Sequence, residues 1–264
     1  MWPTPLLPLV LHIPHAGTLV PSAVVNQFVS HELLQQNMNA LTDWFTDELF
    51  SIPGASAVCT PISRVVVDTE RFTDDAQEPA ARFGQGVIYT LGYNGVPLRR
   101  EPSDQERAHL LENYYTPWHL TLEANIHEHL QEFGFCVVID CHSFPNERLP
   151  TETGQTAERP DICIGTHATN TPDWLTELAS CEFTKHGLSV ALDQPFAGAL
   201  LPEAFKGDPR VLSLMIEINR DLYLLPTRLH EAKQKRENFA ALQVLLQHIL
   251  LKICSEFKTR GITT

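Results

Sequence analysis

Polar side chains suited to hydrolytic chemistry stand at the ends of short apolar runs. His15 follows the run Leu9–Ile13, Asp68 ends RVVVD, His142 follows CVVID, and Glu217 lies inside VLSLMIEI. If these runs are strands of an open α/β sheet, their carboxyl ends border the ligand site. Histidines and carboxylates from separate strands are the donors of a catalytic zinc, which keeps one position for water. A further carboxylate nearby then serves as general base.

Each of these residues also has a plainer interpretation. A histidine at a strand end is more often a polar residue at the surface, so neither His15 nor His142 is diagnostic alone. Glu217 is more informative, because an unpaired carboxylate buried in an apolar run costs on the order of several kcal/mol. It is therefore either a structural ion pair, with Arg220 or another arginine, or a functional acid.

Strands and helices alternate along the chain. Apolar residues three and four apart predict a helix from Ser30 to Leu49. Ser103 to Glu106 is a capping box that opens a long helix, which Pro117 should kink or split. The further predicted strands are Leu9–Ile13, Arg64–Asp68, Cys136–Asp140, Asp161–Gly165, Leu188–Leu192 and Val211–Ile218, and the further helices are Pro172–His186 and a long C-terminal helix after Pro226. Near-continuous apolar strands between helices predict a three-layer α/β/α fold in a single domain, residues 1–264.

Composition excludes several classes of protein. The net charge of −13 argues against nucleic acid and anionic membrane surfaces as partners, although arginines in a pocket can still bind a small anionic substrate. We expect no membrane-spanning helix and no signal peptide, since Met1–Val10 has three prolines and no basic residue. The six cysteines include no C-x-x-C pair. These features predict a reduced, cytoplasmic protein of undetermined oligomeric state.

An ordered set of motifs resembles the N-formylglutamate amidohydrolase family. The segments are LHIPHAGTLVP, RVVVDTERFTDD, IDCHSFP, PDICIGTHATNTP, PFAGALL and LMIEINRDLYL, which together reach from near the N-terminus to about residue 225. The family is similar in fold to zinc exopeptidases and N-acetylmuramoyl-L-alanine amidases, so the resemblance implies a central mixed, mostly parallel sheet. It also implies metal-assisted hydrolysis of a C–N amide bond.

The resemblance assigns a metal site and a catalytic acid. His15 and His142 match the two histidines of the family, and Glu217 matches the catalytic glutamate of the related amidases. For the third ligand, Asp43 corresponds to the carboxylate that follows the first strand in those amidases, and Asp68 is its rival. We assign Zn²⁺ to His15, Asp43 and His142, with Glu217 accepting the proton of the attacking water.

The same comparison suggests residues that bind substrate. Arg71 and Arg220 are the expected partners of a substrate carboxylate, since arginine pairs with carboxylate in bidentate fashion. Asp68, Asn219 and His119 are assigned to shaping the pocket or contacting substrate. His12 is expected to be structural. The segment from Gln194 to Ala199 has Ala197 and Ala199 where the family often has Gly or Lys, and we expect it to border the pocket.

The favoured function is hydrolysis of a small N-acyl amino acid of the N-formylglutamate type, giving formate and glutamate. A zinc carboxypeptidase-like or muramoyl-amide hydrolase with a larger substrate is the first alternative, and a more open pocket would favour it. A non-catalytic ligand-binding module on the same fold is the second, and a Glu217 turned away from the metal ligands would favour that.

Overall fold

Six strands form one mixed sheet in the computed structural model, which describes residues 7–152 and 159–260. The strand order is β2-β1-β3-β6-β4-β5, and every neighbouring pair is parallel except β4 with β6. The mixed, mostly parallel sheet is therefore confirmed. The strands are β1 (Leu9–Ile13), β2 (Ser56–Cys59), β3 (Cys136–Phe144), β4 (Ile162–Thr166), β5 (Val190–Leu192) and β6 (Val211–Asn219).

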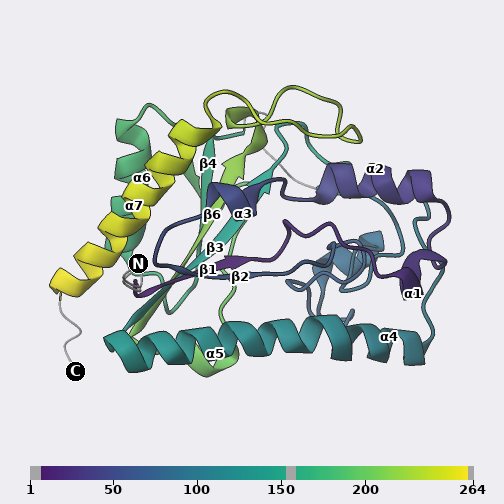
Figure 1. Ribbon diagram of the computed structural model, residues 1–264, viewed down its shortest axis with the longest axis horizontal. Coiled ribbons are helices and arrows are strands. Elements are labelled where there is room, and N and C mark those ends of the chain that lie inside the picture. Colours follow the sequence, from purple (N-terminus) through teal and green to yellow (C-terminus); the bar gives the residue numbers. More distant parts are fainter. Residues whose placement is uncertain (1–6, 153–158, 261–264) are drawn as a thin grey trace, which may run out of the picture.

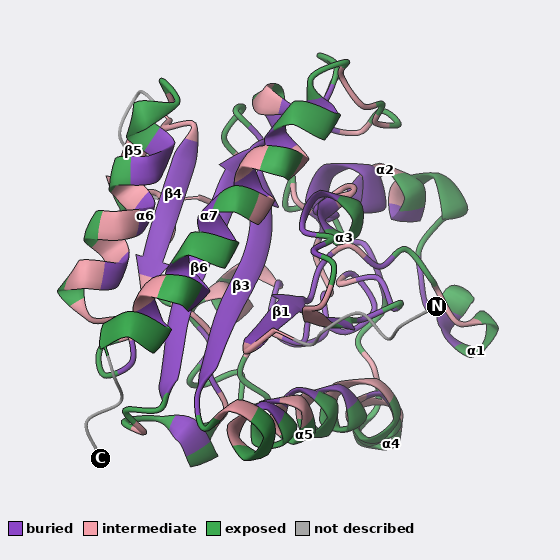
Figure 2. Ribbon diagram, turned by 60° about the vertical axis from the view of Figure 1, so that its left-hand side comes forward, coloured by how far each residue is buried: buried purple, intermediate pink, exposed green. Residues whose placement is uncertain are grey.

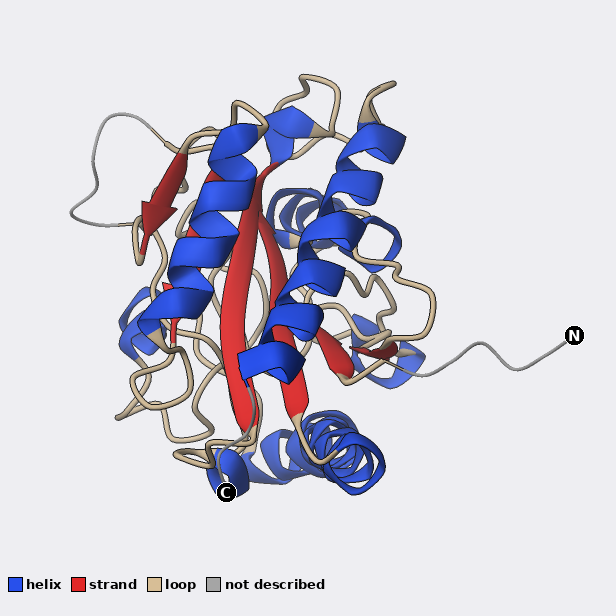
Figure 3. Ribbon diagram, turned by 90° about the vertical axis from the view of Figure 1, so that its left-hand side faces the viewer, coloured by secondary structure: helices blue, strands red, loops and turns tan. Residues whose placement is uncertain are grey.

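Helices cover both faces of this sheet (Figure 1). In Figure 3, α6 and α7 lie across one face, and α5 lies against the opposite face, where it contacts β1, β2 and β3. The helices are α1 (Ser22–Val25), α2 (His31–Leu41), α3 (Thr46–Leu49), α4 (Asp104–Leu110), α5 (Thr116–Phe133), α6 (Asp173–Lys185) and α7 (Phe239–Arg260), with 3₁₀ turns at Pro79–Phe83, Glu203–Phe205 and Arg220–Leu222.

Side chains alternate between the two faces of the sheet along each strand, and the two faces differ in polarity. Leu11, Ile139 and Ile216 belong to the apolar core that includes α7 residues, and Figure 2 shows β3, β4 and β6 as buried. The other face is apolar under α5, at Val10 and Val138, and becomes polar toward the carboxyl ends of the strands. There His12 pairs in register with Asp140, and His142 with Glu217. Register alone thus places four ionisable side chains on one face.

The predicted strand Arg64–Asp68 is wrong. This segment forms a turn, in which Val66 N–H donates to Ser63 and Asp68 N–H donates to Val87. Its three valines are fully buried in a second apolar cluster beside the sheet, so the β-branched run reflects burial and not strand pairing. The strand that pairs with β1 on the side away from β3 is the shorter and less apolar Ser56–Cys59.

The predicted helix from Ser30 to Leu49 is interrupted. Ser30 caps α2, as its side chain accepts from Leu33 N–H, but α2 ends at Leu41 and α3 begins only at Thr46. Between them Phe45 has φ of 62°, and Asp43 N–H donates to the His15 carbonyl. Asp43 therefore lies in a connection and not in the helix where the sequence placed it. The break turns its carboxylate toward β1 and β3.

The long helix before β3 is also divided. Ser103 and Glu106 form the predicted capping box at the start of α4, and a π turn at Leu111–Tyr115 separates α4 from α5. Pro117 is the second residue of α5 and lies directly after this π turn, so the helix continues past the proline with a local change of its hydrogen-bond pattern.

The helix α7 is long and apolar enough to cross a membrane by length and composition alone. Its residues Leu242, Leu246, Ile249 and Ile253 are buried against the sheet. Burial of one face in this way is typical of a core helix.

Candidate active site

Asp68 orients the imidazole ring of His15 through its Nε2 atom. His15 Nε2 lies 2.9 Å from Asp68 Oδ1, and both side chains are buried. With a proton on Nε2 donated to Asp68, the Nδ1 lone pair faces the other way, 3.7 Å from Asp43 Oδ2. Within residues 7–152 and 159–260, Nδ1 has no hydrogen-bond partner. A carboxylate behind an imidazole is how proteins orient a metal-binding histidine.

Asp68 is saturated by its other partners. Arg64 donates to its Oδ2 through both Nε and Nη2, at 3.1 and 2.8 Å, and Tyr89 OH donates to the same atom at 2.6 Å. Burial acts to raise the pKa of Asp68, but the charges of Arg64 and His15 hold it well below its ordinary value. A carboxylate with this many donors has little capacity left to bind a metal directly.

His142 is held in the same way by Asp140. Its Nε2 lies 2.9 Å from Asp140 Oδ1, and its Nδ1 lies 3.2 Å from Asp43 Oδ2. Asp140 is fixed in turn by His12, whose Nδ1 lies 2.5 Å from Oδ1, and by Leu200 N–H, which donates to Oδ2. The buried His12 ring packs against Trp118, with ring centroids 4.4 Å apart.

Asp43 is the carboxylate that both imidazoles share. Arg220 Nη2 donates to its Oδ1 at 2.9 Å, and Ser143 N–H donates to its Oδ2 at 3.2 Å. Burial acts to raise the pKa of Asp43, but the neighbouring His142 and His15 imidazoles and the charge of Arg220 hold it well below its ordinary value. Asp43 is therefore ionised, and its Oδ2 lies where both histidine Nδ1 atoms point.

These donors fit a zinc ion. Two imidazole nitrogens and one carboxylate oxygen are a zinc donor set, and two ligands of a tetrahedral zinc lie about 3.3 Å apart. The separations from Asp43 Oδ2 to the two Nδ1 atoms, 3.2 and 3.7 Å, are close to that value. The unpartnered Nδ1 of His15 is the group that a cation would satisfy.

Glu70 is a second carboxylate near the same histidines. Its ligand atoms lie within 4.8 Å of those of His15 and His142, and within 4.8 Å of those of His12 and Asp140. It approaches His142 at Nε2, 3.1 Å away, which is the nitrogen that Asp140 already holds. Asp43 approaches the two histidines on the Nδ1 side instead, so the structure offers two carboxylates, Asp43 and Glu70, as a third ligand beside His15 and His142.

Glu217 lies beside this cluster and has a different environment. It is buried, and its Oε2 has no hydrogen-bond partner in the described part of the chain. Burial raises the pKa of Glu217 to about 7, with the charge of His142 opposing and that of Asp43 adding to the rise. A carboxyl group with a pKa near neutrality can both accept and return a proton at physiological pH.

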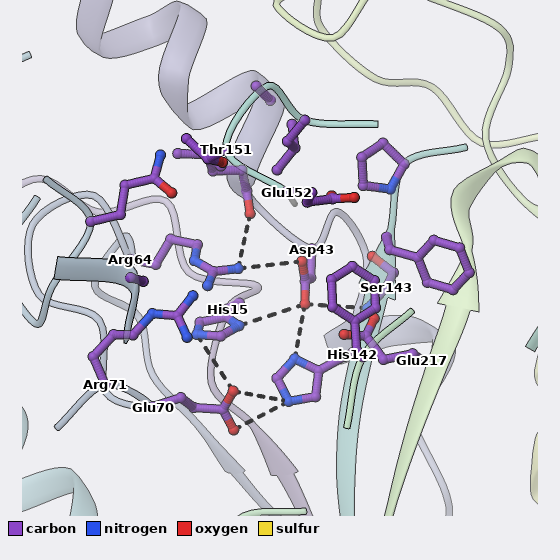
Figure 4. A pocket seen from close by; sticks show the side chains of 18 of the residues that line it. His15, Asp43, Arg64, Glu70, Arg71, His142, Ser143, Thr151, Glu152 and Glu217 are labelled. Carbon is purple, nitrogen blue, oxygen red and sulfur yellow. Dashed lines mark hydrogen bonds and ion pairs between the residues drawn. The ribbon is translucent and has the colours of Figure 1, made fainter. Parts of the chain in front are cut away.

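A cavity of about 380 Å³ opens onto the cluster. His15, Asp43, His142 and Glu217 all line it, and Figure 4 shows them turned toward one another with Arg71 and Glu70 alongside. Phe196 and Ala197, from the segment between Gln194 and Ala199, form part of its wall. The structure therefore brings the four residues of the predicted metal and acid set together in one cavity.

The residues expected to bind substrate lie in different surroundings. Arg71 and Arg220 both line the cavity, but the Arg220 guanidinium donates to Asp43, Ala40 and Ser143. Asn219 accepts from Asp221 N–H and caps the turn after β6. His119 lines a neighbouring cavity, where its Nε2 contacts the Thr69 carbonyl and burial lowers its pKa to about 4.

The sequence analysis did not assign a role to four residues of the site. Asp140 and Glu70 stand at the segment ends that pointed to His142 and Asp68, so their position was available. Arg64 and Tyr89 could not be found in this way, because both donate to Asp68 only once residues 64–68 form a turn instead of the predicted strand.

Comparisons with known proteins agree on one family. Residues 7–224 match the family model described as FGase, N-formylglutamate amidohydrolase. An N-formylglutamate deformylase of Pseudomonas putida is 29% identical over 255 residues, which cover 92% of this chain and 91% of that protein. One of Pseudomonas aeruginosa is 29% identical, covering 83% and 82%.

Solved structures give the same result. The crystal structure of an N-formylglutamate amidohydrolase from Ralstonia eutropha superimposes with a TM-score of 0.83 at 25% identity, covering 97% of this chain and 96% of that one. A gene product of Agrobacterium tumefaciens, at 20% identity and a TM-score of 0.69, covers 96% and 92% and shares the fold.

Proposed function

Since this chain belongs to the N-formylglutamate amidohydrolase family, we propose that it is a zinc-dependent enzyme that hydrolyses N-formyl-L-glutamate to formate and L-glutamate. The observation that carries the metal dependence is the meeting of His15 Nδ1 and His142 Nδ1 at Asp43 Oδ2, with an aspartate behind each imidazole. The substrate is taken from the names of the two Pseudomonas relatives.

His15, Asp43 and His142 would hold the metal. Zinc at this position supplies a Lewis acid that polarises the amide carbonyl and lowers the pKa of water. Asp68 and Asp140 keep the two imidazoles in the tautomer that leaves Nδ1 free. Arg220 fixes Asp43 through its Oδ1 and so leaves Oδ2 for the metal.

Glu217 moves the proton. Its carboxylate accepts a proton from the attacking water, and the same oxygen then delivers that proton to the leaving nitrogen of glutamate. A pKa near 7 suits both halves of this task. Burial in the cavity wall excludes bulk water from the carboxyl group and keeps it beside His142.

The two alternatives make contrasting demands on the same site. A non-catalytic binding module would need no acid beside the metal ligands, yet Glu217 lines their cavity. The cavity of about 380 Å³ is ample for an N-acyl amino acid, whereas a larger substrate, as in a muramoyl-amide hydrolase, would have to extend into the neighbouring cavity that shares Glu70, Arg71 and Ala197 with it.

The test combines metal content with turnover. Purified protein should contain about one zinc per chain, and it should release formate from N-formyl-L-glutamate with an activity that a chelator removes and zinc restores. A protein that hydrolyses the substrate at full rate with no bound metal would refute the metal role. A protein with one zinc that cleaves muramoyl amides in preference would support the larger-substrate alternative.

A further inference from the structure

One wall of the cavity carries donors that the protein itself does not use. Gln85 is 6% exposed, and its Nε2 has no hydrogen-bond partner among residues 7–152 and 159–260. Arg71 Nε is likewise without a hydrogen bond there, since Asp68 Oδ2 is 3.8 Å away. Arg82 is exposed, and the interaction found for its guanidinium in the described chain is stacking over Phe83 at 4.6 Å.

The other arginines around the cavity already have carboxylate partners, and of the cavity's carboxylates Glu70 contacts His142. Arg64 is bound to Asp68, and Arg220 to Asp43. Glu152 pairs with Arg159, so it does not neutralise the wall of Arg71, Gln85 and Arg82. Among the described residues, the wall therefore presents Arg82, which has no carboxylate partner, and Arg71, whose Nε makes no hydrogen bond although Asp68 lies 3.8 Å away. The amide donor of Gln85 completes this wall of the cavity that contains the proposed reacting centre.

The backbone holds this wall in a defined shape. The 3₁₀ turn Pro79–Phe83 is capped by Glu78, whose Oε1 accepts from Ala80 N–H. Gly84 ends the turn with φ of 68°, and a Cβ there would lie 2.5 Å from the Leu91 side chain. Arg82 lies within this turn and Gln85 directly after Gly84, whose positive φ and close contact favour glycine, and both residues line the cavity.

Resting on the function proposed above, we propose that Gln85 and Arg82 are specificity-determining residues that bind the side-chain carboxylate of the substrate, while Arg71 binds its α-carboxylate. Arg71 is the nearer to the metal ligands, because its neighbour Asp68 contacts His15, and Figure 4 shows it beside that histidine. Arg82 is exposed and stands farther out. An N-acyl dicarboxylic amino acid has its two carboxylates in that order from the scissile amide.

A buried amide donor without a partner is the feature that favours this assignment. Folded proteins leave few buried N–H groups unsatisfied, because each loses its bonds to water. A carboxylate oxygen would satisfy Gln85 Nε2 and pair with Arg82 at once. A neutral amide side chain could accept through its carbonyl oxygen, but without the negative charge that strengthens the hydrogen bonds of a carboxylate.

The test compares N-formyl-L-glutamate with N-formyl-L-glutamine, which has the same shape without the second charge. The wild type should prefer the glutamate substrate in kcat/KM by about tenfold or more, as expected for charge-assisted hydrogen bonds. Arg82→Met and Gln85→Leu should each remove most of that preference, chiefly by raising KM for N-formyl-L-glutamate. Arg71→Met should reduce kcat/KM for both substrates, and Arg82→Lys should retain part of the preference.

The control is Arg228→Met, which removes an exposed arginine outside the cavity and should leave kcat/KM unchanged for both substrates. Equal losses on both substrates in Arg82→Met and Gln85→Leu would overturn the proposal, as would a wild type without preference. Calorimetric binding of glutarate, a dicarboxylate without an amide, separates this proposal from the proposed function. If the protein binds glutarate, Arg82→Met weakens that binding and no turnover is found, the carboxylate subsite is supported and the proposed activity is refuted. If glutarate does not bind, the subsite is refuted.

Discussion

Replacing Glu217 with glutamine should affect catalysis and stability in opposite directions. The variant keeps the shape of the side chain and removes the proton acceptor, so kcat should fall by about 10² to 10⁴-fold. Zinc content should stay the same, since Glu217 is not one of the three proposed ligands. Formate release and metal analysis on the same folded sample measure both.

The stability effect follows from the raised pKa. The unfolded chain releases this proton near pH 4.5, whereas the folded, metal-free protein keeps it to about pH 7. The stabilising contribution of the protonated group is therefore complete below pH 4.5 and is lost as the pH rises through 7. The pKa difference corresponds to about 3 kcal/mol, since each tenfold change in an equilibrium constant is ~1.4 kcal/mol.

In the metal-free protein, the free energy of unfolding of Glu217→Gln minus that of the wild type should therefore increase by up to about 3 kcal/mol between pH 4 and pH 8. Urea unfolding of both proteins in the presence of a chelator, at pH values from 4 to 8, measures this. Glu256→Gln on α7, which removes an exposed ion pair with Arg260, is the matched control and should change stability by less than about 0.5 kcal/mol. A variant that keeps its kcat, or that is destabilised to the same extent at every pH, would refute the reasoning and indicate a structural ion pair.

Three further predictions concern the metal ligands, their support and the fold. His15→Ala and His142→Ala should each lose stoichiometric zinc while retaining the circular dichroism of the wild type, and full zinc in both variants would disprove the ligand assignment. Asp43→Asn should weaken zinc binding, whereas Asp68→Asn, which loses the charge that holds Arg64, should mainly lower thermal stability; metal loss confined to the Asp68 variant would reverse the choice. Ser103→Ala should cost about 1 kcal/mol in urea unfolding through the lost helix cap, with kcat unchanged, and a change in kcat would contradict a purely local role.

The local pattern of the chain determines most of the architecture. Apolar runs between amphipathic helices predicted the α/β layers, and five of the six strands lie where these runs placed them. Period-two alternation also accounts for the shared face of His142 and Glu217, because neighbouring parallel strands in register present the same side. Strand ends and capping residues depend on neighbours a few positions away, so they can be predicted from the sequence.

Partnerships between distant residues were decided only by the tertiary structure. Residues 64–68 look like a strand because valine favours strands, but here the three valines are buried in a turn that packs beside the sheet. Arg220 looks like a free substrate-binding cation until the break after α2 brings Asp43, 177 residues earlier, against its guanidinium. Charge and hydrogen-bonding capacity belong to the residue type, but the partner that uses them depends on which chain segments the fold brings together.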